Sequence, residues 1–111
     1  MSFVFKSYTS QVIDAIEQKK RMALEIIGGK AETYAKQLCP VDTGNLRNSI
    51  THTQVKDDTE AIGTTVEYAP FVELGHHTAS GGEVAARPFL RPAAENHGEE
   101  YQNIMKKIMG I

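Results

Sequence analysis

Hydrophobic residues recur every three or four positions over the first third of the chain. This spacing predicts one long helix from about Ser10 to Leu38, with Thr9 or Ser10 as the residue that caps its start. The pair Gly28-Gly29 lies inside the helix, where each glycine costs roughly 1 kcal/mol relative to alanine. We therefore expect either a bend or break at this pair, or a neighbouring element packed closely against the bare backbone.

The predicted helix would be about 40 Å long. A domain of this size has no core long enough to cover such a helix from end to end. The apolar residues of its first turns, Val12, Ile13 and Ile16, therefore need a partner. We expect part of this helix to pack on another subunit.

A β pattern follows the helix, which Pro40 ends because it cannot donate a backbone hydrogen bond. Two segments rich in β-branched residues, Ser49–Val55 and Glu60–Val66, flank the turn-forming segment Lys56–Thr59. This arrangement predicts a β-hairpin, with Gly63 as the candidate for a bulge.

The remainder of the chain predicts helices separated by a loop. The segment Tyr68–Gly75 is expected to form a short helical turn that ends at its glycine. The segment His76–Ala86 has adjacent glycines and few apolar anchors, so we expect a mobile loop. After a short extended segment, Pro92 is suited to the first turn of a C-terminal helix, whose apolar face would contain Ala93, Ala94, His97, Tyr101, Ile104, Met105 and Ile108.

Length and composition indicate one domain covering residues 1–111. Apolar residues make up 41%, charged residues 23%, and the net charge is −2. A sequence pI near 6.1 argues against a nucleic-acid-binding surface. There is no run long enough to span a membrane and no signal-peptide pattern, so a cytoplasmic location is expected. The single cysteine, Cys39, ends an apolar helix face and is interpreted as a small buried hydrophobe.

The triplet Asp42-Thr43-Gly44 has two interpretations. At a helix-to-strand junction, Asp42 would accept hydrogen bonds from backbone N–H groups that follow it, and Gly44 would permit an unusual backbone conformation. The same triplet occurs in the active sites of aspartic proteases, where two carboxylates share a proton and a homodimer could supply both. Those triplets follow an apolar strand, whereas this one follows a long helix, so the junction is favoured.

Histidines provide the remaining candidate chemistry. His76 and His77 follow Glu73 closely, and His52 and His97 could join them in principle. Neighbouring side chains diverge, and the spacing does not match a helical zinc motif, so the ligand set is incomplete. No catalytic constellation is recognised and no cofactor is expected.

Three blocks of sequence together resemble the tail-component family of tailed bacteriophages, which are small tail-completion or head–tail joining proteins. The blocks are Cys39–Ile50, Tyr68–Gly75 and Arg87–Ala93, and they occur in the family's order. The pair His76-His77 departs from the family, which often has a threonine after the glycine. The motif residues that the resemblance marks as structural positions and assembly contacts are Pro40, Asp42, Thr43, Gly44, Leu46, Arg47, Tyr68, Glu73, Gly75, Pro88, Phe89, Leu90 and Pro92.

The resemblance implies an α+β fold, in which the long N-terminal helix and a C-terminal helix pack on a small antiparallel sheet. It also implies a virion protein that forms a ring, expected to have six subunits, at the head-proximal end of the tail or in the neck. Its partners would be further copies of itself, connector or neck proteins, and tail-tube or tail-terminator proteins. It would be no enzyme, and DNA would pass through the ring without specific binding. The alternatives are the dimeric aspartic protease and a cytoplasmic binding module unrelated to phages.

Overall fold

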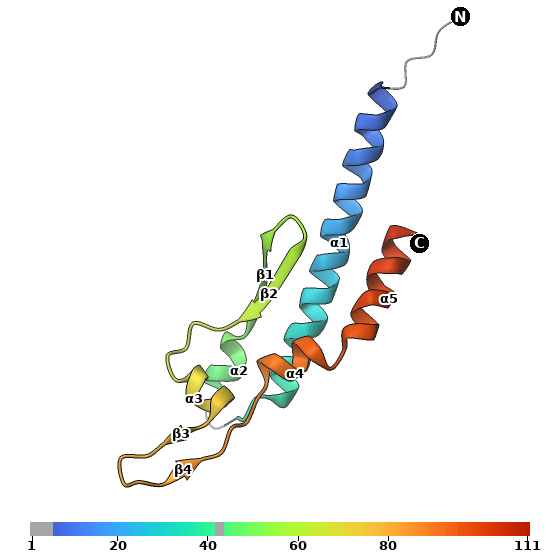
Figure 1. Cartoon of the computed structure of the whole chain (residues 1–111). Coiled ribbons are helices and arrows are strands. Elements are labelled where there is room, and N and C mark those ends of the chain that lie inside the picture. Colours follow the sequence, from blue (N-terminus) through green and yellow to red (C-terminus); the bar gives the residue numbers. More distant parts are fainter. Residues whose placement is uncertain (1–5, 42–43) are drawn as a thin grey trace, which may run out of the picture.

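The computed structural model describes residues 6–41 and 44–111. It is an α+β structure, as expected, in which a long helix is accompanied by small two-stranded antiparallel sheets and shorter helices (Figure 1). In chain order the elements are α1 (Lys6–Leu38), α2 (Asn45–Ser49), β1 (Thr51–Lys56), β2 (Thr59–Gly63), α3 (Ala69–Leu74), β3 (His76–His77), β4 (Glu83–Val84), α4 (Leu90–Glu95) and α5 (Gly98–Met109).

Helix α1 begins earlier than the sequence pattern indicated and does not break. It starts at Lys6, so the prediction that Thr9 or Ser10 caps its start was wrong. It also continues as α-helix through Gly28 and Gly29. Of the two alternatives for this glycine pair, the structure confirms a closely packed neighbour and not a bend or break. An added Cβ atom on Gly28 would lie 2.6 Å from the Nδ1 atom of His52.

The hairpin β1–β2 is present with slightly shorter strands than predicted. Thr51 pairs with Gly63 and Thr53 with Ala61 in the antiparallel register, and Asp57-Asp58 form the turn. The irregularity in the ladder lies between Gln54 and Lys56, so the bulge predicted at Gly63 was misplaced.

The C-terminal part contains two departures from the predicted pattern. The expected loop from residue 76 to residue 86 includes a short antiparallel pair, β3 and β4. The predicted single C-terminal helix is divided into α4 and α5 by a turn at Asn96-His97. Asparagine is a poor helix former and is followed closely by Gly98, so two weak positions coincide at this turn. The short helix α3, which ends at Gly75, is as predicted.

Figure 1 shows the hairpin β1–β2 along one side of α1 and helix α5 along another. The first turns of α1 project beyond both. At the opposite end of α1, helices α2, α3 and α4 come together beside the β3–β4 hairpin. The three sequence blocks named above meet there.

Candidate functional site

The three sequence blocks form one apolar junction near the C-terminal end of α1. The first block contributes Cys39, Leu46 and Ile50, the second contributes Ala69, and the third contributes Phe89 and Ala93. All six are buried, and Phe89 has no exposed surface. Burial raises the pKa of the Cys39 thiol, in agreement with the prediction that this cysteine is a packed hydrophobe. Segments up to about fifty residues apart are therefore held together by a single core.

Glu73 links the second block to the third. Its Oε1 atom accepts hydrogen bonds from the backbone N–H groups of Leu90, at 2.8 Å, and Phe89, at 3.2 Å. These N–H groups belong to the start of α4, where Phe89 itself supplies no side-chain cap. A carboxylate also interacts favourably with the positive end of a helix dipole. Glu73 therefore caps a helix seventeen positions further along the chain, next to a backbone bond from Arg87 N–H to the Val72 carbonyl.

Gly75 has a conformation and an environment that other residues could not adopt easily. Its φ angle is +76°, in the region that favours glycine. An added Cβ atom would lie 2.7 Å from the Val84 carbonyl oxygen and 2.8 Å from the Ala86 nitrogen. The glycine therefore ends α3 and lets the chain turn closely past the strand that returns from the β3–β4 hairpin.

The first block is arranged around the short helix α2. Gly44 precedes it with a φ angle of +82°, and the side chain of Leu46 is 4% exposed within the junction. Pro40 is partly buried where α1 has ended, whereas Arg47 is exposed. Asp42 and Thr43 lie outside the described residues, so the predicted role of Asp42 as a cap stays a prediction.

The other motif residues surround the junction. Tyr68 is 44% exposed at the start of α3, and Pro88 is exposed in the segment before α4. Leu90 and Pro92 are partly buried in the first turn of α4, which is where a proline is tolerated. All the described motif residues are thus brought to one end of the molecule. That they contact other subunits stays a prediction.

A groove with apolar walls lies on the surface of this junction. Its lining includes Val66, Ala69, Pro70, Leu74 and Leu90. Leu74 is 76% exposed. The groove therefore offers apolar surface beside the residues that the family resemblance marks.

A polar cluster connects α5 to α1, on another side of α1 from the β1–β2 hairpin. The Tyr34 hydroxyl donates a hydrogen bond to the Oε2 atom of Glu100 at 2.6 Å, and Lys30 forms an ion pair with the other carboxylate oxygen at 3.1 Å. The imidazole of His97 stacks on the Tyr34 ring, with ring centres 3.6 Å apart. The hydrogen bond from Tyr34, followed by that from Lys30, lowers the pKa of Glu100, and the same Tyr34–Glu100 bond raises the pKa of Tyr34.

The histidines considered as metal ligands are not brought together. His97 is engaged with Tyr34, and His77 is exposed beside Glu83 on the β3–β4 hairpin. His52 instead lies between Glu25 and Glu60, two residues that the sequence pattern did not single out. Their separation along the chain gave no local signal for this cluster, although a close neighbour at Gly28-Gly29 was one of the two alternatives that the sequence left open.

Comparison with known families decides the class of protein. The sequence pattern of a family described as “Bacteriophage HK97-gp10, putative tail-component” matches residues 4–75, which is more than half of the chain. The chain belongs to this HK97-gp10-like family. The match confirms the resemblance to tail components of tailed phages and indicates a structural role. No curated protein and no solved structure matches the chain.

The tail-component match covers the long helix, the first block, the hairpin and the second block, but not the third. The third block is nevertheless tied to the second by Glu73. The protease alternative finds no support, because Gly44 is followed by a helix and the described chain is not built mainly of strands. Among the described residues, no helix is both long and apolar enough to cross a membrane.

Proposed function

We propose that this tail component forms a ring at the head-proximal end of the phage tail or in the neck, where it completes the tail and joins it to the head. The ring is expected to contain six subunits and to bind connector or neck proteins on one face and tail-tube or tail-terminator proteins on the other. The protein would assemble in the host bacterial cytoplasm and remain in the virion. The family match supports the structural role from which this proposal starts.

The observation that supports assembly most directly is the uncovered apolar stripe of α1. Val12, Ile13 and Ile16 are 56%, 53% and 45% exposed on the projecting turns. Further along the same helix, Ala23 and Leu24 are buried by elements of this chain. One stripe is therefore covered along part of its length and open along the rest, which is the pattern expected when a second subunit supplies the missing cover.

The charge balance is compatible with a ring through which DNA passes. The net charge of −2 offers no excess of cations for holding phosphates. Tight, salt-dependent binding to DNA would hinder passage of the genome through such a ring. We accordingly propose no specific nucleic-acid partner.

The stripe can be tested with the double variant Val12→Glu/Ile16→Glu. Both positions are exposed, so the subunit should keep its thermal stability while it loses self-association or binding to connector protein. Light scattering at several protein concentrations, with and without connector protein, would measure this. The matched control is Val55→Glu, because Val55 is equally exposed at 54% but lies on the β1–β2 hairpin.

A complementation experiment tests the role in the particle. A phage that lacks this gene should accumulate filled heads and separate tails, and the native gene should restore joining. Normal joining by the Val12→Glu/Ile16→Glu variant, or a native protein that stays monomeric and binds no connector protein, would contradict the proposal.

A further inference from the structure

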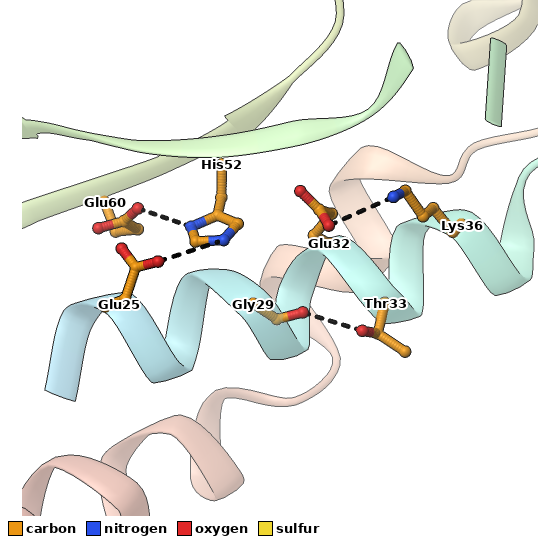
Figure 2. Close-up of polar contacts among 7 residues, drawn as sticks. All are labelled: Glu25, Gly29, Glu32, Thr33, Lys36, His52 and Glu60. Atoms are coloured by element: carbon orange, nitrogen blue, oxygen red, sulfur yellow. Dashed lines mark hydrogen bonds and ion pairs between the residues drawn. The ribbon is translucent and has the colours of Figure 1, made fainter. Parts of the chain in front are cut away.

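Two carboxylates and an imidazole meet where the β1–β2 hairpin packs on α1. Glu25 comes from α1, His52 from β1 and Glu60 from β2 (Figure 2). The Nδ1 atom of His52 is 3.1 Å from the Oε1 atom of Glu60, and its Nε2 atom is 3.7 Å from the Oε1 atom of Glu25. One candidate ligand atom from each residue lies within 4.8 Å of the others. Three elements thus bring potential metal ligands close together, with the two carboxylates against different nitrogens of the imidazole ring.

Glu60 is the least expected member of this cluster, because a carboxylate is costly to bury. Its side chain is only 6% exposed. Its Oε2 atom is buried and has no hydrogen-bond partner among the described residues. The second carboxylate, from Glu25, adds a like charge nearby, which increases the need for a cation.

The backbone of α1 leaves room for the buried pair. Gly28 faces the hairpin, and an added Cβ atom would come within 2.6 Å of the His52 ring and 2.7 Å of the Glu60 side chain. A glycine at this position therefore permits both groups to lie close against the helix. Figure 2 shows both carboxylates on the same side of the imidazole ring, with Glu25 reaching up from α1.

We propose that Glu25, His52 and Glu60 bind one divalent transition-metal ion, with Zn²⁺ as the best-suited probe. One imidazole nitrogen and two carboxylates form a donor set that suits Zn²⁺ better than Mg²⁺ or Ca²⁺, which prefer oxygen ligands alone. Ligand atoms of a tetrahedral zinc ion lie about 3.4 Å apart, so the exposed Glu25 side chain would move toward the Nδ1 atom of His52, which Glu60 already faces. Water, or a group from a neighbouring subunit, takes the fourth position.

The ion would connect α1 to both strands of the hairpin within a single subunit. It would give the buried Oε2 atom of Glu60 a partner that the described residues do not provide. His52 does not supply the missing partner, because its two ring nitrogens face the Oε1 atoms of Glu60 and Glu25 and leave Oε2 of Glu60 without a partner. The site does not depend on the proposed ring and can be tested on the isolated chain.

The experiment is a calorimetric titration of chelator-treated, untagged protein with Zn²⁺, accompanied by thermal melting with and without Zn²⁺. We expect one ion per chain and a rise in melting temperature. His52→Gln and Glu60→Gln should abolish both effects. Glu25 is 72% exposed, so Glu25→Gln should still fold, and it should weaken Zn²⁺ binding roughly tenfold or more.

The matched control is His77→Gln. His77 also has a glutamate neighbour, with its Nδ1 atom 3.5 Å from the Oε1 atom of Glu83, but both side chains are largely exposed. This variant should bind Zn²⁺ as the native chain does. The proposal is overturned if Zn²⁺ neither binds nor raises the melting temperature, if Glu25→Gln binds as tightly as the native chain, or if His77→Gln removes binding. The Glu25→Gln result decides the matter even if the two buried variants fold poorly.

Discussion

The carboxylate of Glu73 accepts a hydrogen bond from the backbone N–H of Leu90 at 2.8 Å. This bond explains how two sequence blocks of the tail-component pattern depend on each other. The glutamate of the second block caps the helix that opens the third, and Phe89, next to the bond, fills the junction core. Glu73 and Phe89, which the sequence offered as candidate contacts with other subunits, therefore have a role inside the subunit.

Replacing Glu73 should destabilise the subunit. Glu73→Ala removes the acceptor for two N–H groups at the start of α4, so we expect a loss of about 1–2 kcal/mol in the free energy of unfolding. Glu73→Gln retains one acceptor oxygen and should lose less. Urea denaturation followed by circular dichroism measures both. Glu95→Ala is the control, because its ion pair with Arg91 is exposed and should contribute less than about 0.5 kcal/mol. Equal effects of Glu73→Ala and Glu95→Ala would contradict the capping role.

The two neighbouring glycines of α1 should respond in opposite directions to alanine. In a helix interior, Gly→Ala usually stabilises by about 1 kcal/mol. Gly29→Ala should do so, because the nearest side-chain atom to its added Cβ is 3.9 Å away. Gly28→Ala should instead destabilise by about 1–3 kcal/mol, because its Cβ would overlap His52 and the buried Glu60. Thermal melts of both variants test this, and a stabilising Gly28→Ala would show that the hairpin does not pack here as described.

The sequence predicted the elements whose signals are local. Apolar periodicity identified α1, β-branched segments identified the hairpin, and Gly75 marked the end of α3. The pair Gly28-Gly29 left two alternatives, a bend or break of the helix and a close neighbour, and the structure shows the second. The sequence did not identify that neighbour. His52 and Glu60 lie against Gly28 because of how the β1–β2 hairpin pairs and packs on α1. The spacing of residues along the chain does not predict that pairing or that packing.

The same limit applies to the turn at Asn96-His97. Weak helix formers make a break there acceptable, but its position is fixed by contacts with another element. His97 stacks on Tyr34, and Glu100 receives the Tyr34 hydroxyl and Lys30. These contacts join residues more than sixty positions apart, and they override the continuous periodicity that predicted one helix.

The Tyr34–Glu100 bond predicts a specific dependence of stability on pH. The pKa of Glu100 is lower in the folded protein than its usual value of 4.5, so this contribution is present above pH 4.5 and is lost as the pH falls through the lowered pKa. Tyr34→Phe keeps the ring stacked on His97 but removes the donor. The native chain should therefore melt higher than Tyr34→Phe at neutral pH, and the difference should shrink as the pH falls below 4.5.

Tyr101→Phe provides the control for that experiment. The Tyr101 hydroxyl donates to the carbonyl oxygen of Ala93 at 2.6 Å, an acceptor that does not titrate. This variant should lose stability by a similar amount at neutral and acid pH. If the melting temperature of Tyr34→Phe stayed below that of the native chain by the same amount throughout the acid range, the hydroxyl would not stabilise the Glu100 carboxylate.

The segment from Gly75 to Ala86 should be the first point of proteolysis in the free subunit and should be protected after assembly. The β3–β4 pair is only two residues long in each strand, and both strands are exposed. Few buried contacts oppose local opening of such a hairpin. Brief digestion with a nonspecific protease, followed by mass spectrometry, would locate the first cut. Strong hydrogen-exchange protection of this segment in the free subunit would contradict the prediction.

The substitution Asp42→Asn separates the two interpretations of the triplet Asp42-Thr43-Gly44. As a cap, Asp42→Ala should lose about 1 kcal/mol of stability, whereas Asp42→Asn should be tolerated because asparagine caps nearly as well. As a protease carboxylate, asparagine should be as damaging as alanine because the shared proton is lost. The measurement pairs thermal melting of both variants with rescue of a phage that lacks the gene. We expect Asp42→Asn to restore the joining of heads and tails. An Asp42→Asn protein that folds normally and rescues nothing would refute the cap and reopen the catalytic interpretation.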